Sequence, residues 1–120
     1  MCPNEQRCHP RFPVQEPVRL RFEGDAKAVN GCLLNLSVGG AFVRCSTPVE
    51  RGRGLKCAFL LAHETAQDVV VCEGTVRWVP SVETLQSIGP GFGMEFVKLT
   101  PRIRCFLEVV TEERLSRPSA

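Results

Sequence analysis

The sequence predicts a mainly β protein, a six-stranded antiparallel β-barrel with a C-terminal α-helix and a flexible N-terminal arm. Short segments of alternating apolar and polar residues, separated by turn residues, predict the barrel. A change to helical spacing near the end predicts the helix, and a proline-rich start without a repeating pattern predicts the arm. We expect the arm at residues 1–17, the barrel and helix at residues 18–116, and a frayed tail at residues 117–120.

The arm contains four prolines, which disfavour a helix or a central strand. Arg7 and Arg11 lie four residues apart in this arm, on either side of Pro10. A guanidinium forms two parallel hydrogen bonds with a phosphate or with the O6/N7 edge of guanine, so both arginines can converge on one anion. The alternative is a solvated basic tail.

Strict alternation starts at Val18, where Val18, Leu20 and Phe22 share one face and the intervening arginines the other. The same pattern recurs along the chain between turn-forming residues. The expected strands are 18–22, 29–36, 41–45, 55–61, 69–79 and 92–97.

The later strands supply most of the expected core. In segment 69–79, Val70, Cys72, Val76 and Trp78 are predicted to form the buried face. Segment 80–91 is rich in Pro, Ser and Gly and predicts a loop.

Thr100 can cap a helix, and Pro101 fits its first turn. Backbone N–H groups in the first turn have no acceptor within the helix, so the N–H that proline lacks is not needed there. An apolar stripe at helical spacing follows, made of Ile103, Phe106, Leu107 and Val110. We expect this helix to cover one end of the barrel. The alternative is a stripe that docks a partner.

Composition excludes several functional classes. The net charge is only +2, so a field for wrapping nucleic acid is missing. The start lacks the apolar region of a signal peptide and no segment reaches the length of a membrane span, so we expect a cytoplasmic protein without membrane insertion. The seven cysteines include no C-x-x-C pair, which makes a metal site or a disulfide framework improbable. We expect Cys32, Cys57 and Cys72 to be core residues.

The stretch 35–40 joins the second and third expected strands. Asn35 and Ser37 are two residues apart and point to the same side of an extended backbone. Gly39 and Gly40 allow another group to approach the main chain closely. This segment can bind a small polar ligand, or it can be an ordinary turn, which selects the same residue types.

Two patterns together resemble the PilZ-domain family: Arg7-x-x-x-Arg11 in the arm, then Asn35-x-Ser37-x-x-Gly40 after a strand. Three further segments are similar to strands of that family, namely 17–20, 74–78 and 91–96. The resemblance extends from about Arg7 to Leu115, which is nearly the whole chain.

The resemblance implies a bacterial receptor for the second messenger cyclic di-GMP, acting in motility or biofilm regulation through an unidentified effector protein. By analogy, Arg7 and Arg11 contact phosphate and guanine. Asn35 binds a guanine edge, Ser37 a guanine amine or a phosphate oxygen, and Gly40 keeps the surface open. Cyclic di-GMP is then a ligand, and neither a cofactor nor a metal is expected.

Gln6 stands where PilZ-like proteins that take an intercalated ligand dimer have a second arginine. We therefore expect one cyclic di-GMP per chain.

Other functions stay open. The first alternative is a degenerate PilZ-like adaptor that acts by protein contacts, in motility or pilus assembly, without nucleotide. A nucleic-acid-binding barrel is less favoured, because Trp78 is the only Trp and there is no Tyr for base stacking. An enzyme is not expected, because no base is evident for Ser37 and the two histidines form no catalytic pattern.

Overall fold

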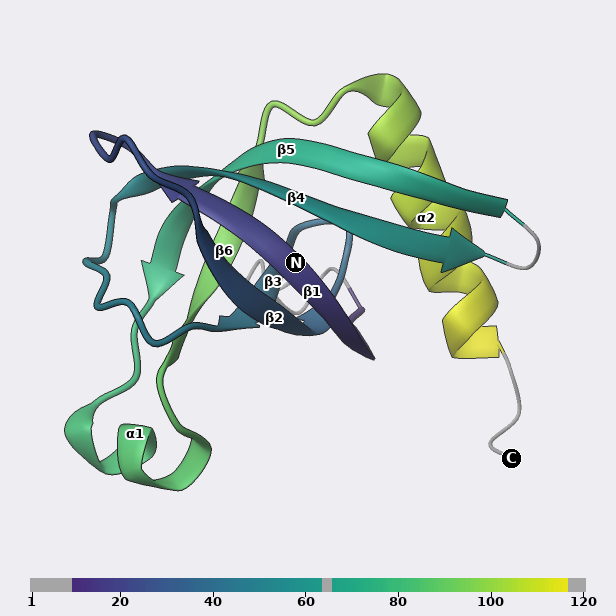
Figure 1. Cartoon of the computed structure of the whole chain (residues 1–120). Helices are drawn as coiled ribbons and strands as arrows, with labels where there is room; N and C mark the ends of the chain where they lie inside the picture. Colours follow the sequence, from purple (N-terminus) through teal and green to yellow (C-terminus); the bar gives the residue numbers. More distant parts are fainter. Residues whose placement is uncertain (1–9, 64–65, 117–120) are drawn as a thin grey trace, which may run out of the picture.

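The computed structural model of the chain describes residues 10–63 and 66–116. Its elements are β1 (Phe12–Phe22), β2 (Val29–Leu36), β3 (Gly40–Arg44), β4 (Gly54–His63), β5 (Ala66–Trp78), α1 (Val82–Ile88), β6 (Gly91–Val97) and α2 (Pro101–Ser116). The strands form one closed antiparallel barrel in the order β1-β2-β3-β6-β5-β4, and β4 pairs with β1 (Figure 1). This arrangement confirms the predicted fold class.

Alternate residues of the strands point into the barrel and fill it. Leu20 of β1 and Val76 of β5 are fully buried, and the rings of Phe22 and Phe92 meet edge to face with centroids 5.7 Å apart. Burial of each such side chain stabilises the fold by about 1.5–3 kcal/mol. The closed barrel therefore gives a rigid frame on which the connecting turns are held.

The first strand begins at Phe12, earlier than the predicted start at residue 18. Phe12 and Val14 are buried and extend the alternation of the strand toward its start. Pro13 and Pro17 do not break it, because β4 pairs with β1 only from Val18 onward. A proline has no backbone N–H to donate to a neighbouring strand. Along this part of β1, one edge has no neighbouring strand, so no hydrogen bond of the sheet is lost there.

The loop predicted at residues 80–91 contains a short helix, α1. Ser81 begins it by accepting a hydrogen bond from the N–H of Thr84 at 3.2 Å, and Gly89 ends it with a φ of 82°. Serine and glycine occur in loops, but they are also the residues that cap helices. The prediction of a loop was wrong because it considered only the first of these preferences.

Trp78 lies outside the barrel core, contrary to prediction, and its exposed fraction is 41%. The pairing of β5 with β6 shifts in register between Val76 and Trp78, so the alternation does not continue to this ring. Trp78 packs instead on Phe42, with centroids 5.6 Å apart. The other predicted core residues of β5, Val70, Cys72 and Val76, are buried.

The C-terminal helix begins as predicted, because the hydroxyl of Thr100 accepts a hydrogen bond from the N–H of Ile103 at 3.2 Å. Leu107 and Val110 are buried against the barrel, so the apolar stripe covers the core. Figure 1 shows α2 lying across the ends of β4 and β5. Within the described residues, neither helix is long and apolar enough to span a bilayer.

Cys57 and Cys72 occupy directly opposed positions of β4 and β5, and their Sγ atoms are 3.4 Å apart as free thiols. A hydrogen bond with Cys57 and burial together raise the pKa of the Cys72 thiol above its ordinary value. The prediction that these two are core residues is confirmed. Cys32 is only partly buried.

Candidate ligand-binding site

The turn between β2 and β3 is shaped by the hydroxyl group of Ser37. Its Oγ accepts hydrogen bonds from the N–H groups of Gly39 and Gly40 at 3.1 and 3.2 Å, and donates to the carbonyl of Gly40 at 3.3 Å. The Ser37 N–H donates to the same carbonyl at 2.9 Å. Ser37 is only 1% exposed. This segment is therefore a well-defined turn, held from inside by the serine.

The same turn is attached to β6. The N–H of Phe96 donates to the carbonyl of Gly39 at 2.9 Å. Gly40 is buried, and a Cβ at this position would overlap the carbonyl oxygen of Met94. The absence of a side chain at Gly40 thus allows the backbone of β6 to pack closely against it. The turn is therefore held by the Ser37 hydroxyl and by β6.

Asn35 connects this turn to the start of β1. Its Oδ1 accepts hydrogen bonds from Arg11 Nη1 at 2.9 Å and from the backbone N–H of Phe42 at 3.1 Å. Because both groups are donors, the amide oxygen must face them, and the NH₂ group of Asn35 points the other way. Arg11 and Asn35, predicted as parts of one site from separate motifs, are therefore in direct contact.

Arg11 is half-buried beside a neutral amide. Burial lowers the pKa of its guanidinium from the ordinary value, although it stays charged at neutral pH. Within the described chain, the arginines in ion pairs with carboxylates are Arg53, Arg77 and Arg102. Among residues 10–63 and 66–116, no carboxylate forms an ion pair with Arg11.

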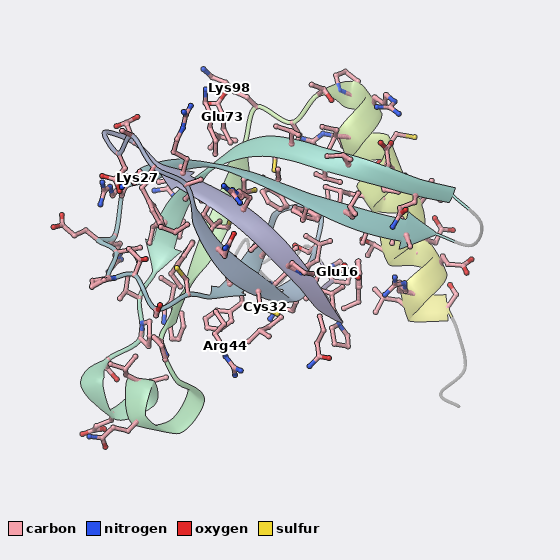
Figure 2. The ribbon with its side chains drawn as sticks, in the orientation of Figure 1. Glu16, Lys27, Cys32, Arg44, Glu73 and Lys98 are labelled. Carbon is pink, nitrogen blue, oxygen red and sulfur yellow. The ribbon has the colours of Figure 1, made fainter. Side chains whose placement is uncertain are left out.

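A cavity of about 160 Å³ adjoins this contact. It lies between the Ser37–Gly39 turn and the corner where β6 leads into α2, and Arg11 lines it. Lys98 and Arg104 also line it. Figure 2 shows Lys98 projecting from the connection between β6 and α2.

The structure thus brings four of the five predicted site residues into one region: Arg11, Asn35, Ser37 and Gly40. Arg7 lies outside the described residues. Contacts of any of these groups with a ligand stay predictions. Sequence reasoning missed Lys98 and Arg104, because both are isolated cations in a corner and on the polar side of a helix, without a motif to mark them.

Comparison with known proteins gives both a family and a set of similar folds. A model of the PilZ domain matches residues 5–110 of the chain. No curated protein matches the sequence.

Among solved structures, the Bacillus subtilis inhibitor of motility (MotI/DgrA) is similar with a TM-score of 0.73 at 16% identity, over 92% of this chain and 51% of that one. The PilZ domain of Escherichia coli YcgR, solved with c-di-GMP, has a TM-score of 0.66 at 11% identity, over 89% of both chains. PlzA of Borreliella burgdorferi, in complex with c-di-GMP, has a TM-score of 0.54 at 15% identity, over 83% of this chain and 38% of that one.

The chain spans about half the length of MotI. At these identities the similarity establishes the fold, whereas the family rests on the match to the domain model. Because that model covers most of the sequence and the barrel has the same fold as solved PilZ domains, the chain belongs to the PilZ domain family.

Proposed function

We propose that this chain is a receptor for cyclic di-GMP, which binds where Arg11 meets the turn formed by residues 35–40. The observation that carries the proposal is the hydrogen bond from Arg11 to Asn35, at 2.9 Å between residues 24 positions apart. It joins the two halves of the pattern that resembles the PilZ family, so both can face a single ligand.

The charge of Arg11 supports an anionic ligand. The half-buried guanidinium of Arg11 lies beside a neutral amide and has lost part of its hydration, while no carboxylate of the described part of the chain pairs with it, which is unfavourable. A bound phosphate supplies the missing negative charge and accepts two parallel hydrogen bonds from the guanidinium. Cyclic di-GMP carries two phosphates, together with two guanine edges that arginine can bind.

Asn35 contributes a donor rather than an acceptor. Its oxygen is occupied by Arg11 and Phe42, which leaves the NH₂ group for the ligand. The matching groups on guanine are the O6 and N7 acceptors. Ser37 and Gly40 hold the turn in the shape that presents this donor, and a direct contact of Ser37 with the ligand stays a prediction.

The size of the cavity supports a site that the arm completes. Pockets that enclose a small-molecule ligand measure about 300–1,000 Å³, whereas this cavity measures about 160 Å³. A cyclic dinucleotide therefore fits only in part, and the rest of it lies outside the cavity. We propose that Arg7 and Arg11 close over this outer part, so that binding orders the arm and changes the surface offered to an effector protein.

The similar structures agree with this function. The YcgR domain and PlzA were solved with c-di-GMP, and MotI is named an inhibitor of motility. We propose by analogy that this chain acts in motility or a related process, as a binding protein that signals through a partner.

Calorimetric titration of cyclic di-GMP into the wild-type chain and an Arg11→Ala variant tests the proposal. We expect one ligand per wild-type chain and a loss of about 2–4 kcal/mol of binding free energy in the variant, as for a charge-assisted bidentate contact. Arg19→Ala, which removes an exposed arginine from the middle of β1, is the matched control. Absence of binding by the wild type would favour the adaptor that acts without nucleotide.

A further inference from the structure

The cavity beside Arg11 has a second cationic wall, formed by Lys98 and Arg104. Lys98 follows the last residue of β6, and Arg104 lies in the first turns of α2. Ser37 and Gly39 line the cavity from the turn between β2 and β3. Cations from two different parts of the fold therefore border one space, which Arg11, the residue before β1, also lines.

These cations have no acidic partner within the described chain. The ion pairs there join Arg53 to Asp25, Arg77 to Glu95 and Arg102 to Asp68.

The one carboxylate that lines the cavity belongs to Glu95. Its Oε1 is 2.8 Å from Arg77 Nε, so its charge is compensated from outside the cavity. The cavity thus retains an excess of positive charge, which favours an anion.

The backbone of this corner is fixed in an unusual conformation. Lys98 has a φ of 53°, the only positive φ of a non-glycine residue in the described chain. Such a conformation costs free energy for a lysine, and it is maintained here by the structure on both sides. Before it, β6 is bonded to the turn through Phe96 and Gly39, and after it Thr100 caps α2. The corner thus keeps Lys98 and Arg104 at the same cavity.

We propose that Lys98 and Arg104 bind a phosphodiester group of the nucleotide, opposite the phosphate or guanine that Arg11 binds. This inference rests on the proposed function and adds two binding residues to it. A cyclic dinucleotide has two phosphates in one ring, so a second cationic group can bind the phosphate that Arg11 leaves free. The guanidinium of Arg104 offers a planar pair of donors, and the ammonium of Lys98 offers a mobile point charge.

The test is calorimetric titration of cyclic di-GMP into Arg104→Ala, Lys98→Ala and the double variant. We expect Kd to rise about 10-fold for Arg104→Ala, a few-fold for Lys98→Ala, and more for the double variant. Arg104→Lys should recover part of the affinity, because it keeps the charge. Two matched controls, Arg102→Ala and Lys27→Ala, remove cations that do not line the cavity and should leave Kd unchanged.

A second measurement distinguishes the loss of a contact with phosphate from a change in the structure of the protein. Raising the salt concentration should weaken binding to the wild type more than binding to the double variant, because salt screens the interaction that the variant lacks. Circular dichroism should show that all variants are folded, since both side chains are exposed.

If the wild type binds while Arg104→Ala and Lys98→Ala bind equally well, this inference is overturned and the proposed function stands. If the wild type itself binds no cyclic di-GMP, the proposed function is overturned.

Discussion

The guanidinium of Arg11 and the amide oxygen of Asn35 form a hydrogen bond 2.9 Å long between the start of β1 and the end of β2. The amide is held in turn by the backbone of Phe42 on β3. The residue before β1 is thus connected to β2 and β3 at one point, beside a cavity whose lining cations form no ion pair with a described carboxylate.

Asn35→Ala should destabilise the fold and weaken ligand binding together. The substitution leaves the N–H of Phe42 without its acceptor and releases Arg11, so we expect a loss of about 1–3 kcal/mol in the free energy of unfolding. Denaturant unfolding measures this loss. Asn30→Ala, at an exposed position of the same strand, is the control and should change stability by less than about 0.5 kcal/mol. Equal stability of the two variants would contradict the prediction.

Gly40→Ala should destabilise the barrel because the new methyl group overlaps the carbonyl of Met94. Relief of the overlap requires β3 and β6 to separate, and overpacking of this kind costs about 1–3 kcal/mol. Thermal unfolding followed by circular dichroism measures the effect. In Gly93→Ala, the nearest atom to the added Cβ is 3.4 Å away, which is an ordinary contact, so this variant should melt close to the wild type. A Gly40→Ala variant as stable as Gly93→Ala would show that the strands can move apart freely.

The raised pKa of the buried Cys72 thiol should make the free energy of unfolding fall at alkaline pH. The pKa of Cys72 is raised in the folded state, so its contribution is fully present below the ordinary thiol pKa and is lost as the pH rises above it. Between about pH 7 and about pH 10, the wild type should therefore lose more stability than Cys72→Val, which cannot ionise. Denaturant unfolding at both values checks this. Cys105→Ala removes an exposed thiol and should follow the wild type. Parallel pH profiles for the wild type and Cys72→Val would refute the prediction.

Addition of cyclic di-GMP should slow hydrogen exchange in residues 1–11, which precede β1. The reason is that the proposed closure of the arm over the ligand buries backbone amides that the sequence predicts to be irregular. Mass spectrometry of the exchanged peptides measures the protection, and the Arg11→Ala variant should show none at the same ligand concentration. Unchanged exchange in the wild type at saturating ligand would rule out the ordering of the arm.

The alternation of apolar residues was sufficient to predict the fold. The errors of that prediction have physical causes. Phe12 and Val14 continue the alternation of β1, but Pro13 and Pro17 concealed it. The prolines are tolerated because part of one strand edge has no neighbour, and pairing of that kind is not visible in the sequence. Trp78 lies outside the predicted buried face because the register of β5 and β6 shifts. This shift depends on β6 as much as on β5, so the sequence of β5 alone does not predict it.

The proximity of some predicted site residues is observed, whereas their binding role stays a prediction. The resemblance to the PilZ family marked Arg11 and Asn35, and the structure confirms that they meet. Arg104 reaches the same cavity through the packing of α2 on the barrel, and Lys98 through the connection between β6 and α2. Their position at the cavity results from tertiary packing, so it cannot be predicted from the spacing of residues in the sequence.

The central claim is that cyclic di-GMP lies between Arg11 and the turn formed by residues 35–40. Titration of the isotope-labelled protein with cyclic di-GMP, followed by NMR, tests it most directly. We predict that the side-chain signals of Arg11 and Asn35 and the backbone amide signals of residues 37–40 shift and saturate together. Shifts confined to a distant surface, such as the outer face of β4 and β5 around Leu60 and Val69, or no shifts at all, would contradict the claim.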